Sequence, residues 1–163
     1  MKKRWMVLVV SFVGLTSGCG NDHDHNEHDH HLKEEACLHM ENGPATVIAG
    51  STDAVSAIAT EHDDWEHKRV ELSLVEESGS FVGFMQLEIA SAGDYSIFVD
   101  SDATLEIDGA VPESNRAETE CDGISHVNVF ELSVGEHTLK VTSTEAVVQL
   151  VIEADSEETH HDH

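Results

Sequence analysis

Histidine alternates with aspartate and glutamate near both ends of the chain, where apolar residues are scarce. Neutral imidazole and carboxylate groups together bind divalent zinc, nickel or copper, whereas the sulfur ligands that favour copper(I) are absent from both stretches. We expect metal-binding tails, with zinc as the ion and nickel or copper as alternatives. The alternative for the front stretch is a solvated spacer. The expected ligands are His23, His25, His28, His30, His31, His160, His161 and His163.

A third group of such residues lies in the middle of the chain. His62 and His67 occur with four acids in the segment 61–67. Three protein ligands and one open position would make a zinc site there. Neighbouring strand residues point to opposite faces, so the segment would have to curl back toward His67. An exposed acidic loop is the alternative interpretation.

The front of the chain predicts export. A basic start at residues 2–4 precedes an apolar run at 5–15 and then small residues, as in a secretory signal. The run is too short for a stable transmembrane helix.

Leu15-Thr16-Ser17-Gly18-Cys19 resembles the lipobox of bacterial lipoproteins. The resemblance implies that residues 1–18 are a signal peptide and that Cys19 is lipidated. The protein would then be anchored to a membrane of the cell envelope, as an outer-membrane protein facing the periplasm or the cell surface. A secreted protein with an incidental cysteine is the alternative.

If Cys19 carries lipid, two cysteines remain. In an oxidising compartment we expect Cys37 and Cys121 to form a disulfide. The bridge would bring His39 and His126 to one edge of the fold. The competing interpretation is that both thiols are metal ligands together with His39.

The chain is strongly acidic, with a formal net charge of −25. Without residues 1–18, which hold three of the eight basic residues and none of the 33 acidic ones, five basic residues remain and the charge is −28. Such a surface excludes nucleic acid as a partner and docking onto anionic lipid by charge. A saline habitat or a need for solubility explains the acidity equally well.

Short alternating apolar runs separated by turn residues fill residues 35–155 and predict strands. We expect an all-β fold, an antiparallel β-sandwich of eight or nine strands with jelly-roll or Greek-key connections. Residues 19–34 would be a disordered linker and residues 156–163 a disordered tail. The expected strands are 46–49, 55–59, 70–75, 81–90, 95–99, 104–107, 127–132, 138–141 and 147–152.

Part of this region resembles a known family of exported domains. The units Gly93-Asp94-Tyr95-Ser96-Ile97 and Gly135-Glu136-His137-Thr138-Leu139, with the turn Asp108-Gly109, look like the β-sandwich of bacterial pre-peptidase C-terminal domains. The resemblance covers roughly residues 81–153. It implies a non-catalytic accessory module, sometimes binding calcium or substrate.

Known catalytic motifs are missing from the sequence. It contains no Gly-x-Ser-x-Gly elbow, His-Glu-x-x-His helix or phosphate-binding glycine loop, so we expect no enzyme. The leading hypothesis is a lipid-anchored protein that captures or buffers a divalent metal for homeostasis or uptake. A metal transporter or another metal-binding protein would be its partner. The alternative is an envelope module that binds peptide or glycan and uses the tails as spacers.

Overall fold

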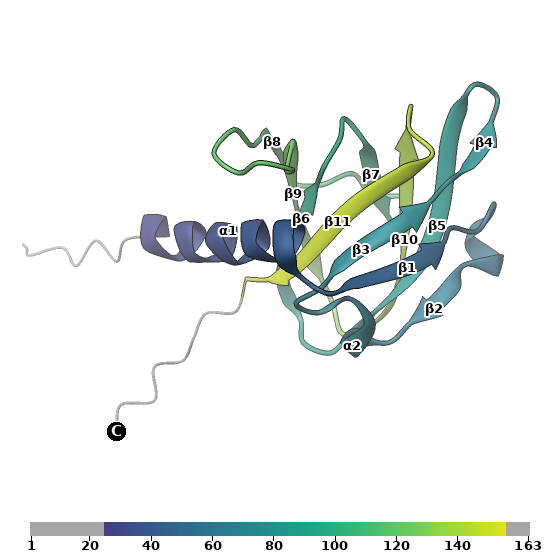
Figure 1. Cartoon of the computed structure of the whole chain (residues 1–163). Coiled ribbons are helices and arrows are strands. Elements are labelled where there is room, and N and C mark those ends of the chain that lie inside the picture. Colours follow the sequence, from purple (N-terminus) through teal and green to yellow (C-terminus); the bar gives the residue numbers. More distant parts are fainter. Residues whose placement is uncertain (1–24, 156–163) are drawn as a thin grey trace, which may run out of the picture.

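The computed structural model describes residues 25–155, which form two β-sheets and a long N-terminal helix (Figure 1). Cys19, His23, His160, His161 and His163 lie outside the described residues, as does the expected signal peptide. The elements, in chain order, are α1 (His25–Asn42), β1 (Ala45–Ala49), the 3-10 helix η1 (Ala54–Ser56), β2 (Ile58–Thr60), α2 (His62–Trp65), β3 (Arg69–Ser73), β4 (Val75–Glu77), β5 (Ser80–Ile89), β6 (Gly93–Val99), β7 (Thr104–Ile107), β8 (Ser114–Ala117), β9 (His126–Leu132), β10 (Gly135–Ser143) and β11 (Val147–Ala154).

The strands form two mixed sheets, so the all-β prediction is confirmed but the purely antiparallel arrangement is wrong. The six-stranded sheet has the order β1-β3-β11-β6-β9-β8. The five-stranded sheet has the order β2-β5-β10-β7, with β4 also paired to β5. β1 runs parallel to β3, and β2 runs parallel to β5. Each parallel pair is joined by a long crossover, as parallel pairing requires.

The structure has eleven strands within residues 25–155, more than the expected eight or nine. The segment 70–75 divides into β3 and β4, which belong to different sheets. β8 is an edge strand whose four residues are all exposed. Its sequence, Ser-Asn-Arg-Ala, has no apolar alternation, which explains why the sequence did not predict it.

Alternating side chains from both sheets meet in one buried core. In β3, Val70 and Leu72 are fully buried while the residues between and beside them are partly exposed. β7 contributes Leu105 and Ile107 in the same way. This inward and outward alternation is the pattern that identified the strands in the sequence.

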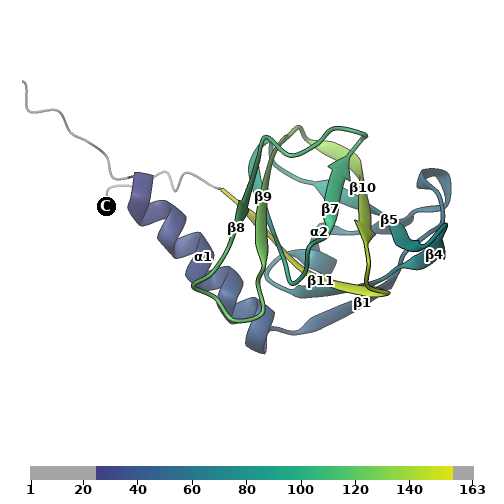
Figure 2. The same cartoon turned by 90° about the horizontal axis from the view of Figure 1, so that it is seen from above.

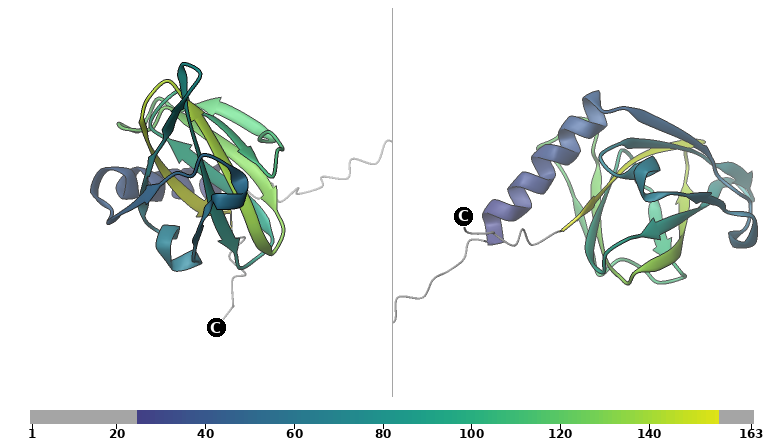
Figure 3. Two further views of the ribbon diagram at one scale, coloured as in Figure 1. Left: turned by 90° about the vertical axis from the view of Figure 1, so that its right-hand side faces the viewer. Right: turned by 90° about the horizontal axis from the view of Figure 1, so that it is seen from below.

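Residues 25–34 are helical, so the prediction of a disordered linker is wrong for this part of the chain. α1 lies along the outside of the six-stranded sheet (Figures 2 and 3) and contacts β11. Ala36 and Met40, one helical turn apart, are buried there. They belong to a small second cluster, separate from the main core, with Phe98, Cys121, Ile124, Val127 and Val151. Within residues 25–155, no helix combines the length and apolar character needed to cross a bilayer.

Candidate metal centre

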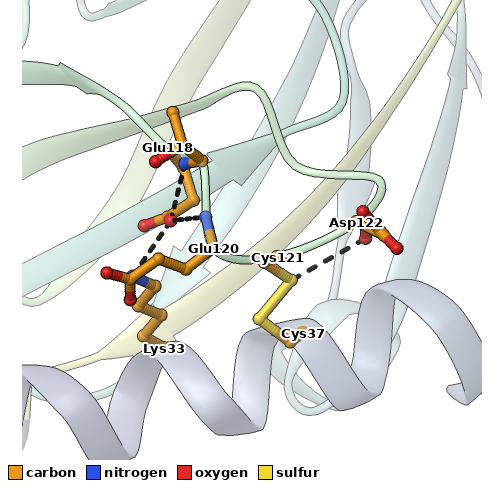
Figure 4. Close-up of a disulfide and its surroundings, with 7 residues drawn as sticks. Lys33, Cys37, Glu118, Glu120, Cys121 and Asp122 are labelled. Atoms are coloured by element: carbon orange, nitrogen blue, oxygen red, sulfur yellow. Dashed lines mark hydrogen bonds and ion pairs between the residues drawn. A yellow bond between two sulfur atoms is a disulfide. The ribbon is translucent and has the colours of Figure 1, made fainter.

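The predicted disulfide is confirmed and fastens α1 to the sandwich. Cys37 of α1 is bonded to Cys121 of the β8–β9 loop, with 5.7 Å between their Cα atoms (Figure 4). Lys33, one turn earlier on the helix, pairs with Glu118 at 2.9 Å and with Glu120. These interactions raise the pKa of Lys33, chiefly through its hydrogen bond to Glu120. Because the two sulfur atoms are bonded to each other, the interpretation of both cysteines as thiolate ligands does not hold.

Another flank of α1 carries a histidine and a carboxylate. Glu35 and His39 are spaced by one turn, so their side chains lie on the same face. His39 Nε2 is 3.7 Å from Glu35 Oε1. The helix ends just beyond, where the Gly43 amide donates to the His39 carbonyl at 2.9 Å. A Cβ atom at Gly43 would lie 2.5 Å from that oxygen, so the close approach requires glycine.

His67 faces this flank from the sandwich side. It lies between α2 and β3 with a φ of 52°, a left-handed conformation that is uncommon for residues other than glycine. Its Nδ1 atom is 3.4 Å from Glu35 Oε1. The rings of His67 and His39 have centroids 5.6 Å apart. Ligand atoms of Glu35, His39 and His67 all lie within 4.8 Å of one another.

Glu153 of β11 adds a buried carboxylate to this group. Only 3% of the residue is exposed, and its Oε1 atom has no hydrogen-bond partner. Its Oε2 atom is 3.6 Å from His67 Nδ1, the nitrogen that also faces Glu35. Burial, and then the negative charges of Glu35 and Glu66, raise the pKa of Glu153 to about 8. Proximity to a cation would favour its ionised form.

Three separations among these side chains can be compared with the spacing of ligands around a tetrahedral ion. Bonds of 2.0–2.2 Å from zinc to nitrogen and oxygen place neighbouring ligand atoms roughly 3.4 Å apart. The three measured separations in the group are 3.4, 3.6 and 3.7 Å. Glu35, His39 and His67 thus form one group of possible ligands, and Glu153 adjoins this group beside His67. We refer to Glu35, His39, His67 and Glu153 as the junction site.

The structure places His62 and His67, which the sequence suggested as ligands of one site, in two different groups of possible ligands. His62 groups instead with Asp63 and Glu66, and its Nδ1 atom is 3.0 Å from Glu66 Oε2. The other oxygen of Glu66 is 3.9 Å from His67 Nε2, so this carboxylate lies between the two groups. The separation arises because the segment forms the short helix α2 rather than an open loop. The His62 ring packs edge-on against Trp65, with centroids 4.6 Å apart.

The disulfide does not bring His39 and His126 together. His126 Nε2 is 2.8 Å from Asp102 Oδ1, whereas His39 groups with Glu35 and His67. Among the tail histidines, His25 and His28 fall within the first turns of α1. His30 and His31 are exposed further along this helix, with His30 Nδ1 3.4 Å from Glu34 Oε1.

Of the four residues of the junction site, one was identified from the sequence, two could have been found, and one could not. The spacing of Glu35 and His39 is the signal for a shared helix face, but it is informative only once a helix is recognised there. His67 was identified. Glu153 gives almost no signal, because an acid ending an apolar run usually marks a strand leaving the core.

A separate hollow surrounds His137. The cavity measures about 430 Å³ and is lined by Asp108, Ser133 and His137 among others. His137 Nδ1 is 2.7 Å from Asp108 Oδ2, while Nε2 is 2.8 Å from the Ser133 carbonyl oxygen and 3.4 Å from its hydroxyl. The closer neighbour of Nε2 is thus a carbonyl, which can only accept a hydrogen bond. The Thr138 amide also donates to Asp108, so the arrangement holds two turns together.

Comparisons with known proteins give no assignment. No protein-family model and no curated protein matches the chain. One solved structure with some similarity is the pre-peptidase C-terminal domain of a collagenase from Bacillus anthracis. It is 16% identical, with a TM-score of 0.35, over 60% of this chain and 95% of that one. A β-glucosidase from Paenibacillus barengoltzii is 11% identical, with a TM-score of 0.32, over 66% of this chain and 13% of the enzyme. Neither score is high enough to support an argument about function.

Proposed function

We propose that the protein is an exported, lipid-anchored metal-binding protein that captures zinc for homeostasis or uptake. One observation carries this proposal: donor atoms of Glu35, His39 and His67 lie within 4.8 Å of one another beside the buried carboxylate of Glu153. Imidazole and carboxylate ligands suit zinc, and nickel or copper(II) would compete for the same donors.

The unpartnered oxygen of Glu153 supports a cation rather than a chance cluster of acids. Exposed acids are common on a protein with 33 of them, but a buried carboxylate is costly unless a partner compensates it. The charges nearest to it that affect its pKa are the carboxylates of Glu35 and Glu66, which oppose its ionisation. A divalent ion at the junction site would compensate all three.

The proposed anchor would keep the site close to a membrane. From Cys19 to the start of α1 at His25 a chain can extend at most about 20 Å. Glu35 follows ten residues later in the helix, a rise of about 15 Å. In this proposal the tail histidines collect ions and pass them to the junction site. Delivery from there would be to a transporter or another metal-binding protein in the envelope.

Titration calorimetry of the purified protein with zinc tests the proposal. The double variant His39→Asn/His67→Asn should lose the tightest site, because two of its four ligands are removed; asparagine tolerates the left-handed backbone at position 67. His126→Asn, remote from the junction site, is the matched control and should retain it. Replacing His160, His161 and His163 with asparagine should reduce only the number of weaker sites.

Two outcomes would contradict the proposal. One is binding of zinc, nickel and copper no tighter than binding of magnesium. The other is an unchanged tightest site in the double variant, which would place that site elsewhere in the chain.

A further inference from the structure

The junction site is divided between two separate structural units. Glu35 and His39 belong to α1, whereas His67 and Glu153 belong to the sandwich. Glu35 and His39 lie beside His67 only while α1 is docked. Any interaction that fixes the helix against the sheet therefore contributes to the geometry of the site.

The disulfide is the covalent part of that docking. Cys37 lies between Glu35 and His39 in the sequence, and on a helix it projects from a different flank. Figure 4 shows the bridge beside Lys33, which pairs with Glu118 and Glu120 of the same loop that carries Cys121. Further contacts come from the small apolar cluster around Ala36 and Met40 and from a hydrogen bond of 2.9 Å donated by Arg69 to the Met40 carbonyl.

We propose that the Cys37–Cys121 disulfide regulates metal retention at the junction site: the oxidised protein holds the ion tightly, and reduction releases α1 and weakens binding. This inference rests on the proposed function, because it concerns the affinity of the same site. Most of a helix's stability in a protein comes from packing of its apolar face, and α1 has few apolar residues to keep it docked without the bridge. Loss of docking separates two ligands from the other two.

A dithiol supplies the reducing step. One of its thiolates attacks a sulfur of the bridge, and the second then closes the mixed disulfide into a cyclic product. Two electrons and two protons pass from the dithiol to Cys37 and Cys121, which become thiols. Cys37 is partly exposed and Cys121 is buried, so the attack occurs at the Cys37 sulfur.

Coupling of this kind acts in both directions. If the disulfide tightens zinc binding by a given factor, bound zinc must make the disulfide harder to reduce by the same factor. We expect a factor of at least about ten, within the usual range for coupled sites. A tenfold change corresponds to about 30 mV in the reduction potential of a two-electron couple.

The first experiment compares zinc affinity in two states of the full chain. One sample is oxidised, and the other is reduced, alkylated with iodoacetamide and freed of reductant, so that the thiols cannot act as ligands. The double variant Cys37→Ser/Cys121→Ser provides the same comparison without alkylation. The expected result is zinc binding at least tenfold weaker in both, with circular dichroism showing that the strands are retained.

The second experiment needs no variant and covers the case in which the reduced protein does not fold. The wild-type protein is equilibrated with mixtures of reduced and oxidised dithiothreitol, with free zinc fixed by a chelator buffer or absent. Zinc should shift the midpoint of reduction to a potential lower by about 30 mV or more.

The possible outcomes separate the two proposals. Equal zinc affinity in the oxidised and reduced forms, or an unchanged midpoint, overturns the regulatory inference and leaves the metal-binding function intact. Tighter binding by the reduced, unalkylated protein would also overturn it, because the thiols would then be ligands themselves. Absence of zinc binding by the oxidised protein would instead refute the proposed function.

Discussion

At the scale of single residues, Glu153 is the most unusual group in the described part of the chain. It is a carboxylic acid buried on a central strand, with one oxygen unpartnered and the other near His67. A residue in this position destabilises the metal-free protein whenever it must ionise. A bound ion would compensate this charge.

The raised pKa of Glu153 predicts how stability depends on pH without metal. Below the ordinary pKa of 4.5 the carboxyl is protonated in both the folded and the unfolded chain. Between 4.5 and about 8 the unfolded chain loses this proton while the folded chain keeps it, so the free energy of unfolding should fall as pH rises. The decline should amount to a few kcal/mol, at about 1.4 kcal/mol per pKa unit.

Glu153→Gln should remove this part of the decline, because glutamine does not ionise. Urea unfolding at pH 5 and pH 8.5 in the presence of a chelator measures the effect. Glu88→Gln, an exposed carboxylate on β5, is the control and should behave like the wild type. The same Glu153 variant should bind zinc at least about tenfold more weakly. If the free energy of unfolding of the Glu153→Gln variant fell between pH 5 and pH 8.5 as much as that of the wild type, the Glu153 carboxyl would not titrate as described.

At the scale of elements, α1 decides whether the junction site exists. Its stretch of histidines and acids resembles disordered sequence, and among residues 30–42, whose side chains are described, only Ala36 and Met40 are buried. Long-range interactions stabilise the helix, above all a disulfide between residues 84 positions apart. In the chain-entropy model such a closure contributes about 4–5 kcal/mol to folding. The cysteine count predicted this bridge, but the local sequence pattern did not indicate that residues 25–34 would be helical.

The strands, by contrast, were largely predictable. β7 spans the residues expected for it, and β5, β6 and β9 differ from the expected ranges by at most two residues at either end. Their alternating apolar residues directly encode a buried and an exposed face. The parallel pairing of β1 with β3, and of β2 with β5, could not be predicted, because it depends on crossovers rather than on the pattern within each strand. The junction site shares this difficulty, since its ligands come from three distant segments.

Docking of α1 through its apolar contacts gives an element-scale prediction. Met40→Ala should lower the free energy of unfolding by about 2–5 kcal/mol, because it leaves a cavity in the small cluster between helix and sheet. Leu38→Ala is the matched control: it lies on the same helix, is 59% exposed, and should change stability by less than about 0.5 kcal/mol. Both are measured by urea unfolding. Equal losses of unfolding free energy in the two variants would mean that the small apolar cluster does not hold α1 against the sheet.

At the scale of the whole molecule, the β-sandwich would provide one half of the proposed metal site and the docked helix would provide the other. The two halves are joined by a disulfide on one flank of the helix and would be joined by an ion on the other. The acidic surface, with a formal net charge of −25, would concentrate cations around this junction. The proposed lipid anchor would hold the exported protein in the cell envelope. The terminal histidines would bind metal ions there.

A crystal structure of the protein loaded with one equivalent of zinc, with anomalous scattering recorded at the zinc edge, tests the central claim most directly. The account predicts a single strong peak between α1 and β11, within about 2.2 Å of ligand atoms from Glu35, His39, His67 and Glu153. A zinc ion bound elsewhere, with these four side chains unchanged, would contradict it.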